Sequence, residues 1–262
     1  MTDGYGRKIE YLRMSVTDAC NLKCVYCMPP DGMKECPCRQ AMSADEFVEI
    51  ARAAASLGMK KLRITGGEPL IRSDIVPLVR RLGEIPGIED MSLTTNATLL
   101  APIAKELFEA GIHRINISLD TLDAQKYEKI TRGGHLADAL DGIRAAFEAG
   151  MSPVKLNTVL IGGFNDDEIE ALAALTLHYP VQLRFIELMP IGDTKGEFSP
   201  EAYLPDSTVL AKLPQLEPVP SEKHTVARLY KLPGAVGEIG LISPLSNHFC
   251  AECNRLRLTA DG

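Results

Sequence analysis

Three cysteines lie close together near the start of the chain, in the run DACNLKCVYCMPP. Cys20, Cys24 and Cys27 have C-x3-C-x2-C spacing. Closely spaced thiolates hold zinc or iron–sulfur clusters, and most such sites use four ligands. Three thiolates can hold three irons of a four-iron cluster and leave the fourth iron open to a substrate or cofactor. The spacing therefore indicates either a catalytic iron–sulfur cluster or a zinc site completed by a distant His or Cys.

The cysteines as a set favour metal chemistry over disulfides. Five of the seven lie within the first 38 residues and two within the last 13. An odd number distributed in this way suits metal sites better than a disulfide framework. The N-terminal residues lack the order of a signal peptide, so we expect a cytoplasmic protein in a reducing compartment.

Composition narrows the class of partner. The 262 residues are 45% hydrophobic and 24% charged, with a formal net charge of -7. This balance predicts a globular protein without a nucleic-acid or membrane surface. No apolar run is long enough to span a membrane. An anionic ligand would therefore need a local basic pocket.

Short apolar strands alternate with amphipathic helices along most of the chain, which predicts a parallel sheet. We expect strands at 11–16, 61–65, 91–95, 114–119, 154–161 and 182–188. Helices fit at 43–57, 73–83, 101–110, 123–130, 136–149 and 166–177. Ser43 with Glu46 predicts a capping box, and Asn165 predicts an N-cap. Six units are too few for an eight-unit barrel, so a partial barrel or an open doubly wound sheet remains.

One face of every predicted strand is polar. Successive side chains of a strand point to opposite faces, so residues two apart share a face. A doubly wound sheet buries both faces and should be apolar throughout. The pattern therefore favours an α/β partial six-unit barrel whose lumen takes a polar ligand. The lumen-facing residues are Arg13, Ser15, Arg63, Thr65, Ser92, Thr94, Asn116, Ser118, Lys155 and Asn157.

The pattern changes after residue 190. Loop-rich segments precede HTVARLY and EIGLIS, which are typical of two antiparallel strands, and the tail NHFCAECNRLRLTADG follows. We therefore expect a barrel domain over 1–190. Residues 191–262 would form a C-terminal extension of loops and strands that closes the barrel.

The first cysteine run resembles the radical S-adenosylmethionine (SAM) superfamily. The resemblance includes Tyr26 before the last cysteine and the GGEP segment, Gly66 to Pro69, after the second strand. In that superfamily the open iron of a [4Fe-4S] cluster is chelated by SAM. The resemblance implies that Gly66, Gly67 and Glu68 contact this cofactor. A glycine pair suits close backbone approach to a ligand, and Glu68 can balance an ammonium group.

Further segments are similar, in order, to the MoaA family of GTP 3′,8-cyclases. They include LRITGGEPLIR, RINISLDTLD, VKLNTVLIGGFNDDEI, LRFIELMPIG and CNRLRLT. The resemblance implies a partial barrel that cleaves SAM to a 5′-deoxyadenosyl radical. That radical would remove the ribose 3′ hydrogen of GTP, and the resulting carbon radical would attack C8 of guanine. This is the first step of molybdenum cofactor biosynthesis, and a MoaC-type enzyme would consume the product.

The resemblance also implies roles for individual residues. The metal ligands would be Cys20, Cys24, Cys27, Cys250 and Cys253. The SAM contacts would be Tyr26, Gly66, Gly67, Glu68, Ser118 and Met189. GTP would be bound by Arg13, Arg63, Thr94, Lys155, Arg255 and Arg257, of which Arg255 and Arg257 would also act in catalysis. Four of these six positions lie on the polar face that strand alternation predicts, namely Arg13, Arg63, Thr94 and Lys155.

The end of the sequence departs from the family pattern. The family's second [4Fe-4S] cluster uses three cysteines, and this sequence ends before the position of the third. We therefore expect an incomplete ligand set at Cys250 and Cys253. Cys36 and Cys38 are also outside the family pattern, and two free thiols in a loop are the expectation there.

Two other functions remain open from the sequence. One is a radical SAM enzyme that modifies a peptide or RNA with the help of an auxiliary cluster, although no docking module is visible. The other is a non-catalytic protein that binds zinc or an iron–sulfur cluster. The cyclase interpretation implies GTP, an external electron donor and a MoaC-type enzyme as partners. It also allows a homodimer.

Overall fold

A curved sheet of ten strands organises the computed structural model, which describes residues 2–29, 41–190, 198–220, 226–248 and 253–262. Its strand order is β10-β1-β2-β3-β4-β5-β6-β9-β8-β7. The strands are β1 (Tyr11–Ser15), β2 (Lys61–Thr65), β3 (Asp90–Thr95), β4 (Arg114–Ser118), β5 (Val154–Leu160), β6 (Val181–Glu187), β7 (Glu217–Val219), β8 (Arg228–Lys231), β9 (Glu238–Ile242) and β10 (Arg255–Leu258).

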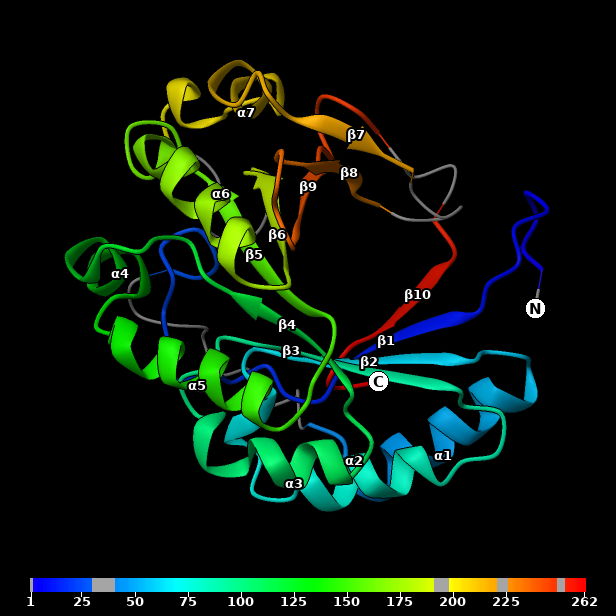
Figure 1. Cartoon of the computed structure of the whole chain (residues 1–262). Coiled ribbons are helices and arrows are strands. Elements are labelled where there is room, and N and C mark those ends of the chain that lie inside the picture. The colour runs from blue at the N-terminus through cyan, green and yellow to red at the C-terminus, as the bar shows by residue number, and fades with distance from the viewer. Residues whose placement is uncertain (1, 30–40, 191–197, 221–225, 249–252) are drawn as a thin grey trace.

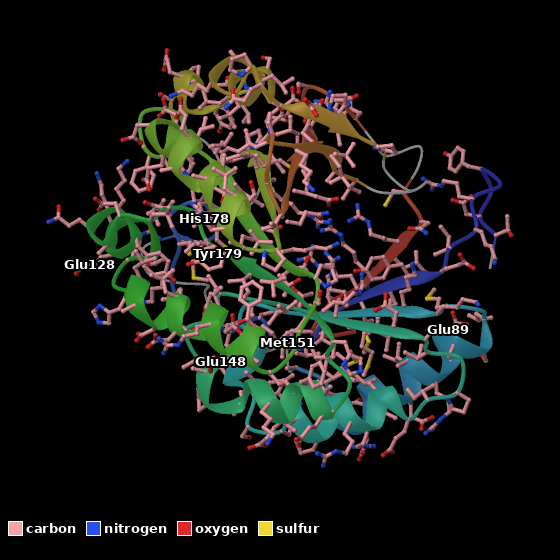
Figure 2. All side chains as sticks on the ribbon, in the orientation of Figure 1. Glu89, Glu128, Glu148, Met151, His178 and Tyr179 are labelled. Carbon is pink, nitrogen blue, oxygen red and sulfur yellow. The ribbon has the colours of Figure 1, made fainter. Side chains whose placement is uncertain are left out.

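Helices cover the convex side of this sheet (Figure 1). They are α1 (Ala44–Ser56), α2 (Ile75–Gly83), α3 (Ala104–Glu109), α4 (Ala124–Thr131), α5 (Leu136–Glu148), α6 (Ile169–His178) and α7 (Ser207–Lys212). Short 3-10 turns are η1 (Pro69–Ile71), η2 (Ala101–Ile103), η3 (Asp166–Glu168) and η4 (Pro200–Ala202). Figure 2 shows Glu128 on α4 and Glu148 on α5 pointing away from the sheet. The concave side is thus left to polar side chains, which confirms the predicted partial barrel.

The C-terminal strands extend both edges of the sheet. β10 pairs in parallel with β1, while β9 pairs in parallel with β6 and carries antiparallel β8 and β7. The antiparallel pair predicted at HTVARLY and EIGLIS is confirmed. The strand order of the described residues begins at β10 and ends at β7, so the extension widens the sheet without sealing it.

Local signals predicted one helix cap fully and a second one in position only, because Asn165 is the N-cap of η3. The Ser43–Glu46 capping box is present at α1. Asn165 makes no side-chain cap hydrogen bond to the turn that follows it. Its Nδ2 donates to the carbonyls of Asp120 and Val159, and its Oδ1 accepts from Ile161 N–H, because these backbone groups are buried between two strand ends and need partners.

The apolar faces of the strands and helices form the main core. Leu12, Met14, Leu62 and Ile64 alternate with the polar residues of β1 and β2 and are buried under the helices. No described helix has the length and apolar character that a membrane-spanning segment requires.

Candidate active site

The cysteine loop, residues 20–28, follows β1 at the carboxyl end of the strand. Cys20 and Cys24 are half-buried and Cys27 is exposed. Parallel strands end on the same edge of a sheet, so the segments after β2, β3, β4 and β6 share this edge. Ligand-binding residues of α/β barrels gather at this edge.

The glycine pair after β2 packs against the segment that leads into the cysteine loop. Gly67 N–H donates to Thr17 O at 2.7 Å, and Glu68 N–H donates to Ala19 O at 2.9 Å. A Cβ at Gly66 would lie 2.6 Å from Thr17 O, and one at Gly67 would lie 2.2 Å from Ala19 O. These glycines are therefore required by the close approach of the chain's own backbone. Their contact with SAM stays a prediction.

The Glu68 carboxylate is buried and satisfied by protein donors. Leu70 N–H donates to its Oε1 at 3.0 Å, and the Thr95 hydroxyl donates to the same oxygen at 2.7 Å. Asn96 N–H donates to Oε2 at 2.7 Å, and Asn96 Nδ2 lies 3.9 Å from Cys20 Sγ. Burial raises the pKa of Glu68. Glu68 thus holds the end of β3 beside the first cysteine, a role that spacing alone did not predict.

A buried carboxylate links the cysteine loop to the ends of β4 and β5. The Tyr26 hydroxyl donates to Asp120 Oδ2 at 2.7 Å, and Val159 N–H donates to Oδ1 at 2.8 Å. Burial raises the pKa of Asp120 to about 6. Asp120 was not predicted from the sequence as a site residue, although its position just after a predicted strand is typical of one. Ser118 ends β4, and Met189 follows β6 with 38% of its surface exposed.

The three thiols share one electrostatic environment. Burial raises the pKa of Cys20, Cys24 and Cys27. The neighbouring negative charges of Asp120 and of the other two thiolates raise the pKa of Cys24 further. Among the described residues, no three His, Cys, Asp or Glu side chains converge on a single-ion site. A four-iron cluster does not require side chains that converge on one ion, because each thiolate binds a different iron.

Cationic side chains line the concave side of the sheet. Parallel pairing places Arg13 between Arg257 of β10 and Arg63 of β2. Lys155 of β5 lies beside Asn116 of β4, on the same side of the sheet. Figure 2 shows nitrogen-tipped side chains gathered on this concave side. We call these residues the cationic wall: Arg13, Arg63, Lys155, Arg184, Arg255 and Arg257.

Mutual repulsion and burial shift the pKa values of the wall. Burial, and after it the guanidinium charges of Arg184, Arg114 and Arg63, together lower the pKa of Lys155 to about 7. Burial and neighbouring cations lower the pKa values of Arg13 and Arg184 to about 10. Among the described residues, Arg13, Arg63, Lys155 and Arg184 form no ion pair with a carboxylate, whereas Arg114 pairs with Asp90. The wall therefore has uncompensated positive charge.

Arg184 was missed in the sequence. It is 9% exposed and donates from Nε to Gln182 Oε1 at 2.8 Å. Gln182 Nε2 in turn donates to Glu238 Oε2 at 2.8 Å. The same period of two that selected Lys155 would have selected Gln182 and Arg184 on the sixth strand.

Several buried polar atoms beside the cations have no hydrogen-bond partner within the described part of the chain. Buried polar groups in proteins are nearly always satisfied, so such a group points to a ligand or water. All six lie on the concave side of β1 to β5, and Thr94 is among the predicted GTP contacts. They are Tyr11 Oη, Arg63 Nε, Ser92 Oγ, Thr94 Oγ1, Asn116 Oδ1 and Asn157 Oδ1.

The second cysteine segment reaches the wall through β10. Arg255 Nε donates to Cys253 Sγ at 3.3 Å. Burial raises the pKa of Cys253, but the hydrogen bonds and charge of Arg255 outweigh it and lower the pKa overall. Cys250, like Cys36 and Cys38, lies outside the described residues.

Comparisons with known proteins match both parts of the chain. The model of the radical SAM superfamily matches residues 14–176, and the model described as Molybdenum Cofactor Synthesis C matches residues 181–262. A GTP 3′,8-cyclase of Peptoclostridium acidaminophilum is 52% identical over all of this chain and 81% of its own length. The GTP 3′,8-cyclase of Moorella thermoacetica is 48% identical over all of this chain and 82% of its own length.

Solved structures share the fold at low identity. Streptococcus suis SuiB covers 97% of this chain and 59% of its own length, with a TM-score of 0.69 and 17% identity. Methylornithine synthase covers 79% of this chain and 62% of its own length, with a TM-score of 0.62 and 17% identity.

Proposed function

Since this chain belongs to the radical SAM superfamily and, within it, to the GTP 3′,8-cyclases, we propose that the cysteine loop and the cationic wall divide the reaction between them. The enzyme cyclises GTP to 3′,8-cyclo-7,8-dihydro-GTP in the first step of molybdenum cofactor biosynthesis. The cysteine loop would hold the cluster and SAM, and the wall would hold the triphosphate. The observation that carries this division is the set of cations and unsatisfied polar atoms on the concave side of the sheet whose first strand leads into the loop.

The loop fits a four-iron cluster with one open iron. Cys20, Cys24 and Cys27 supply three thiolates from one loop, and burial disfavours their charge in the absence of metal. Iron offsets that penalty because the thiolate charge is shared with the cluster. When bound with SAM, the cluster supplies the electron for reductive cleavage of SAM. We assign Tyr26, Gly66, Gly67, Glu68, Ser118 and Met189 to the SAM site, since Ser118 ends β4 and the others follow β1, β2 and β6 at the same edge.

The wall fits a triphosphate. Arginine forks and a lysine make charge-assisted hydrogen bonds to phosphate oxygens. Arg184 is added here to the residues that we assign to GTP, because its charge also lacks a carboxylate partner among the described residues. Arg255 and Arg257 would reach the substrate from β10, which lies beside β1. The orientation of GTP follows from the phosphates on the wall, with the ribose toward the loop.

The proposal also includes a second cluster at the second cysteine segment and two protein partners. Cys253 and Cys250 would ligate a second cluster, and Arg255 favours the thiolate form of Cys253. An external one-electron donor would reduce the first cluster. A MoaC-type enzyme would consume the cyclised product.

Isotope transfer tests this assignment. The reconstituted protein would be incubated without oxygen with SAM, reductant and GTP that carries deuterium at the ribose 3′ position. We expect cyclised GTP and singly deuterated 5′-deoxyadenosine in mass spectra, with unlabelled GTP as the control. Formation of 5′-deoxyadenosine without deuterium, together with intact GTP, would contradict the proposed substrate position.

A further inference from the structure

The end of α4 is joined to the cysteine loop by backbone hydrogen bonds. Lys23 N–H donates to Thr131 O at 3.1 Å, and Val25 N–H donates to Ile130 O at 2.9 Å. The last carbonyls of a helix have no partner inside the helix. Here the cysteine loop supplies those partners, so the loop and the helix end form one unit.

The residue that ends α4 has an unusual backbone conformation. Arg132 is the C-cap, with φ 55 and ψ 54 in the left-handed region. This conformation favours glycine because a side chain makes it strained, by about 1 kcal/mol or more. Gly133 and Gly134 follow directly, yet the arginine takes the first left-handed position. Strain of this kind persists where the surrounding structure uses the residue.

The Arg132 side chain bridges both sides of the loop. Its Nη1 donates to Met28 O at 2.7 Å and to Lys23 O at 3.1 Å. These two carbonyls flank Cys24 and Cys27 in the chain. The helix that carries Arg132 is anchored, because Tyr127 and Ile130 are buried. The guanidinium therefore fixes the separation of the loop's two halves from a rigid base.

We propose that Arg132 is a positioning residue that shapes the cysteine loop to receive its iron–sulfur cluster. This inference rests on the proposed function of the loop. A cluster binds three thiolates at set separations, and a loop that is already ordered loses less conformational entropy when the cluster binds. The guanidinium supplies the order, and the left-handed backbone aims it at the two carbonyls.

The variant Arg132→Asn tests the role of the side chain's length while it keeps the left-handed backbone conformation. Asparagine tolerates left-handed backbone but is too short to bridge both carbonyls. We expect its melting temperature to change only slightly, because relief of the left-handed strain offsets part of the stability lost with the two hydrogen bonds. We expect iron per chain after anaerobic reconstitution to fall, and reductive SAM cleavage to fall about tenfold or more because two charge-assisted hydrogen bonds are lost. The electron paramagnetic resonance change on SAM addition should weaken, and the KM for SAM should rise.

Two further variants complete the test. Arg132→Lys keeps the charge and can donate to one carbonyl at a time, so we expect intermediate iron content. Arg81→Asn removes an exposed arginine of α2 that pairs with Asp45 of α1, and it should behave like the unsubstituted enzyme. Full iron content together with an unchanged SAM-dependent spectrum in Arg132→Asn would overturn the proposal. A lower melting temperature alone, with spectrum and KM unchanged, would overturn it as well.

The experiment distinguishes an error in the proposed function of the loop from an error in the role of Arg132. If the unsubstituted protein takes up no cluster and leaves SAM intact, the loop's function is wrong. If the unsubstituted protein cleaves SAM and Arg132→Asn does so equally well, only the role of Arg132 is wrong.

Discussion

The cysteine loop and the cationic wall differ in whether the protein supplies partners for their buried polar groups. In the loop, backbone and side-chain partners surround the site, as Glu68, Asp120 and Arg132 illustrate. In the wall, cations face one another and polar atoms lack partners within the described residues. The polar groups of the loop are thus satisfied by the protein itself. The wall holds repulsion that an anionic substrate would relieve, and under our proposal GTP would supply the missing interactions.

The largest effect should follow from breaking the loop. Cys24→Ala would remove one of the three thiolates that we assign to the first cluster, which would have no spare protein ligand. We expect 5′-deoxyadenosine formation to be abolished, measured by chromatography after anaerobic reconstitution. Cys253→Ala is the matched control and should retain SAM cleavage, since that cysteine lies in the second segment. Equal activity of Cys24→Ala and the unsubstituted enzyme would remove the distinction between the two sites.

Substitutions in the cationic wall should have a smaller effect, and they should weaken GTP binding rather than SAM cleavage. Arg63→Ala and Lys155→Ala each remove charge-assisted contacts worth about 1.5–3 kcal/mol, so GTP affinity should fall roughly tenfold or more. SAM cleavage without GTP should be largely retained. Equilibrium binding of GTP measures the first result, and Arg144→Ala, on the outer side of α5, is the control. Unchanged affinity in both wall variants would show that these side chains do not face the substrate.

The pH dependence of GTP binding should sharpen the comparison further. Lys155 has a pKa of about 7 in the free protein, so it loses its charge as pH rises above that value. A bound triphosphate favours the charged form, so binding takes up a proton and affinity falls as pH rises. Above about pH 7.5 the phosphates are already ionised, since their last pKa is about 6.

Calorimetry in buffers of different ionisation enthalpy measures that proton. Lys155→Arg keeps a permanent charge, so its GTP binding should take up less of a proton over the same range. Equal proton uptake in this variant would assign the effect to another group.

The smallest effect concerns stability without ligand. The pKa of Lys155 is lower in the fold than the usual 10.5, so the unfolded chain binds the proton more tightly and this group's contribution to stability increases from about pH 7 to 10.5. Each pKa unit corresponds to about 1.4 kcal/mol, so Lys155→Met should raise the free energy of unfolding at pH 7 by about 1 kcal/mol or more. Urea unfolding at pH 7 and pH 10 measures this difference in the free energy of unfolding. The increase in Lys155→Met should be smaller at pH 10. A loss of stability would mean that the repulsion in the wall is already relieved.

The sequence by itself determined the six strand–helix units and the polar face of the sheet. These features are local, because the period of two in a strand depends only on neighbouring residues. Strand alternation alone therefore places Arg13, Arg63, Thr94 and Lys155 on one side, and the register of the sheet agrees. The three-cysteine spacing likewise predicted a metal site within one short loop, and the open iron of that site stays a prediction.

Only the tertiary structure decided which distant residues meet. Pairing of β10 with β1 places Arg257 beside Arg13, although the two lie near opposite ends of the chain. The Asn165 side chain makes no cap hydrogen bond, because the buried strand ends bind its amide, and the glycine pair faces backbone. Arg132 reaches the cysteine loop only because α4 folds against it. Such contacts depend on long-range packing, which local patterns do not encode.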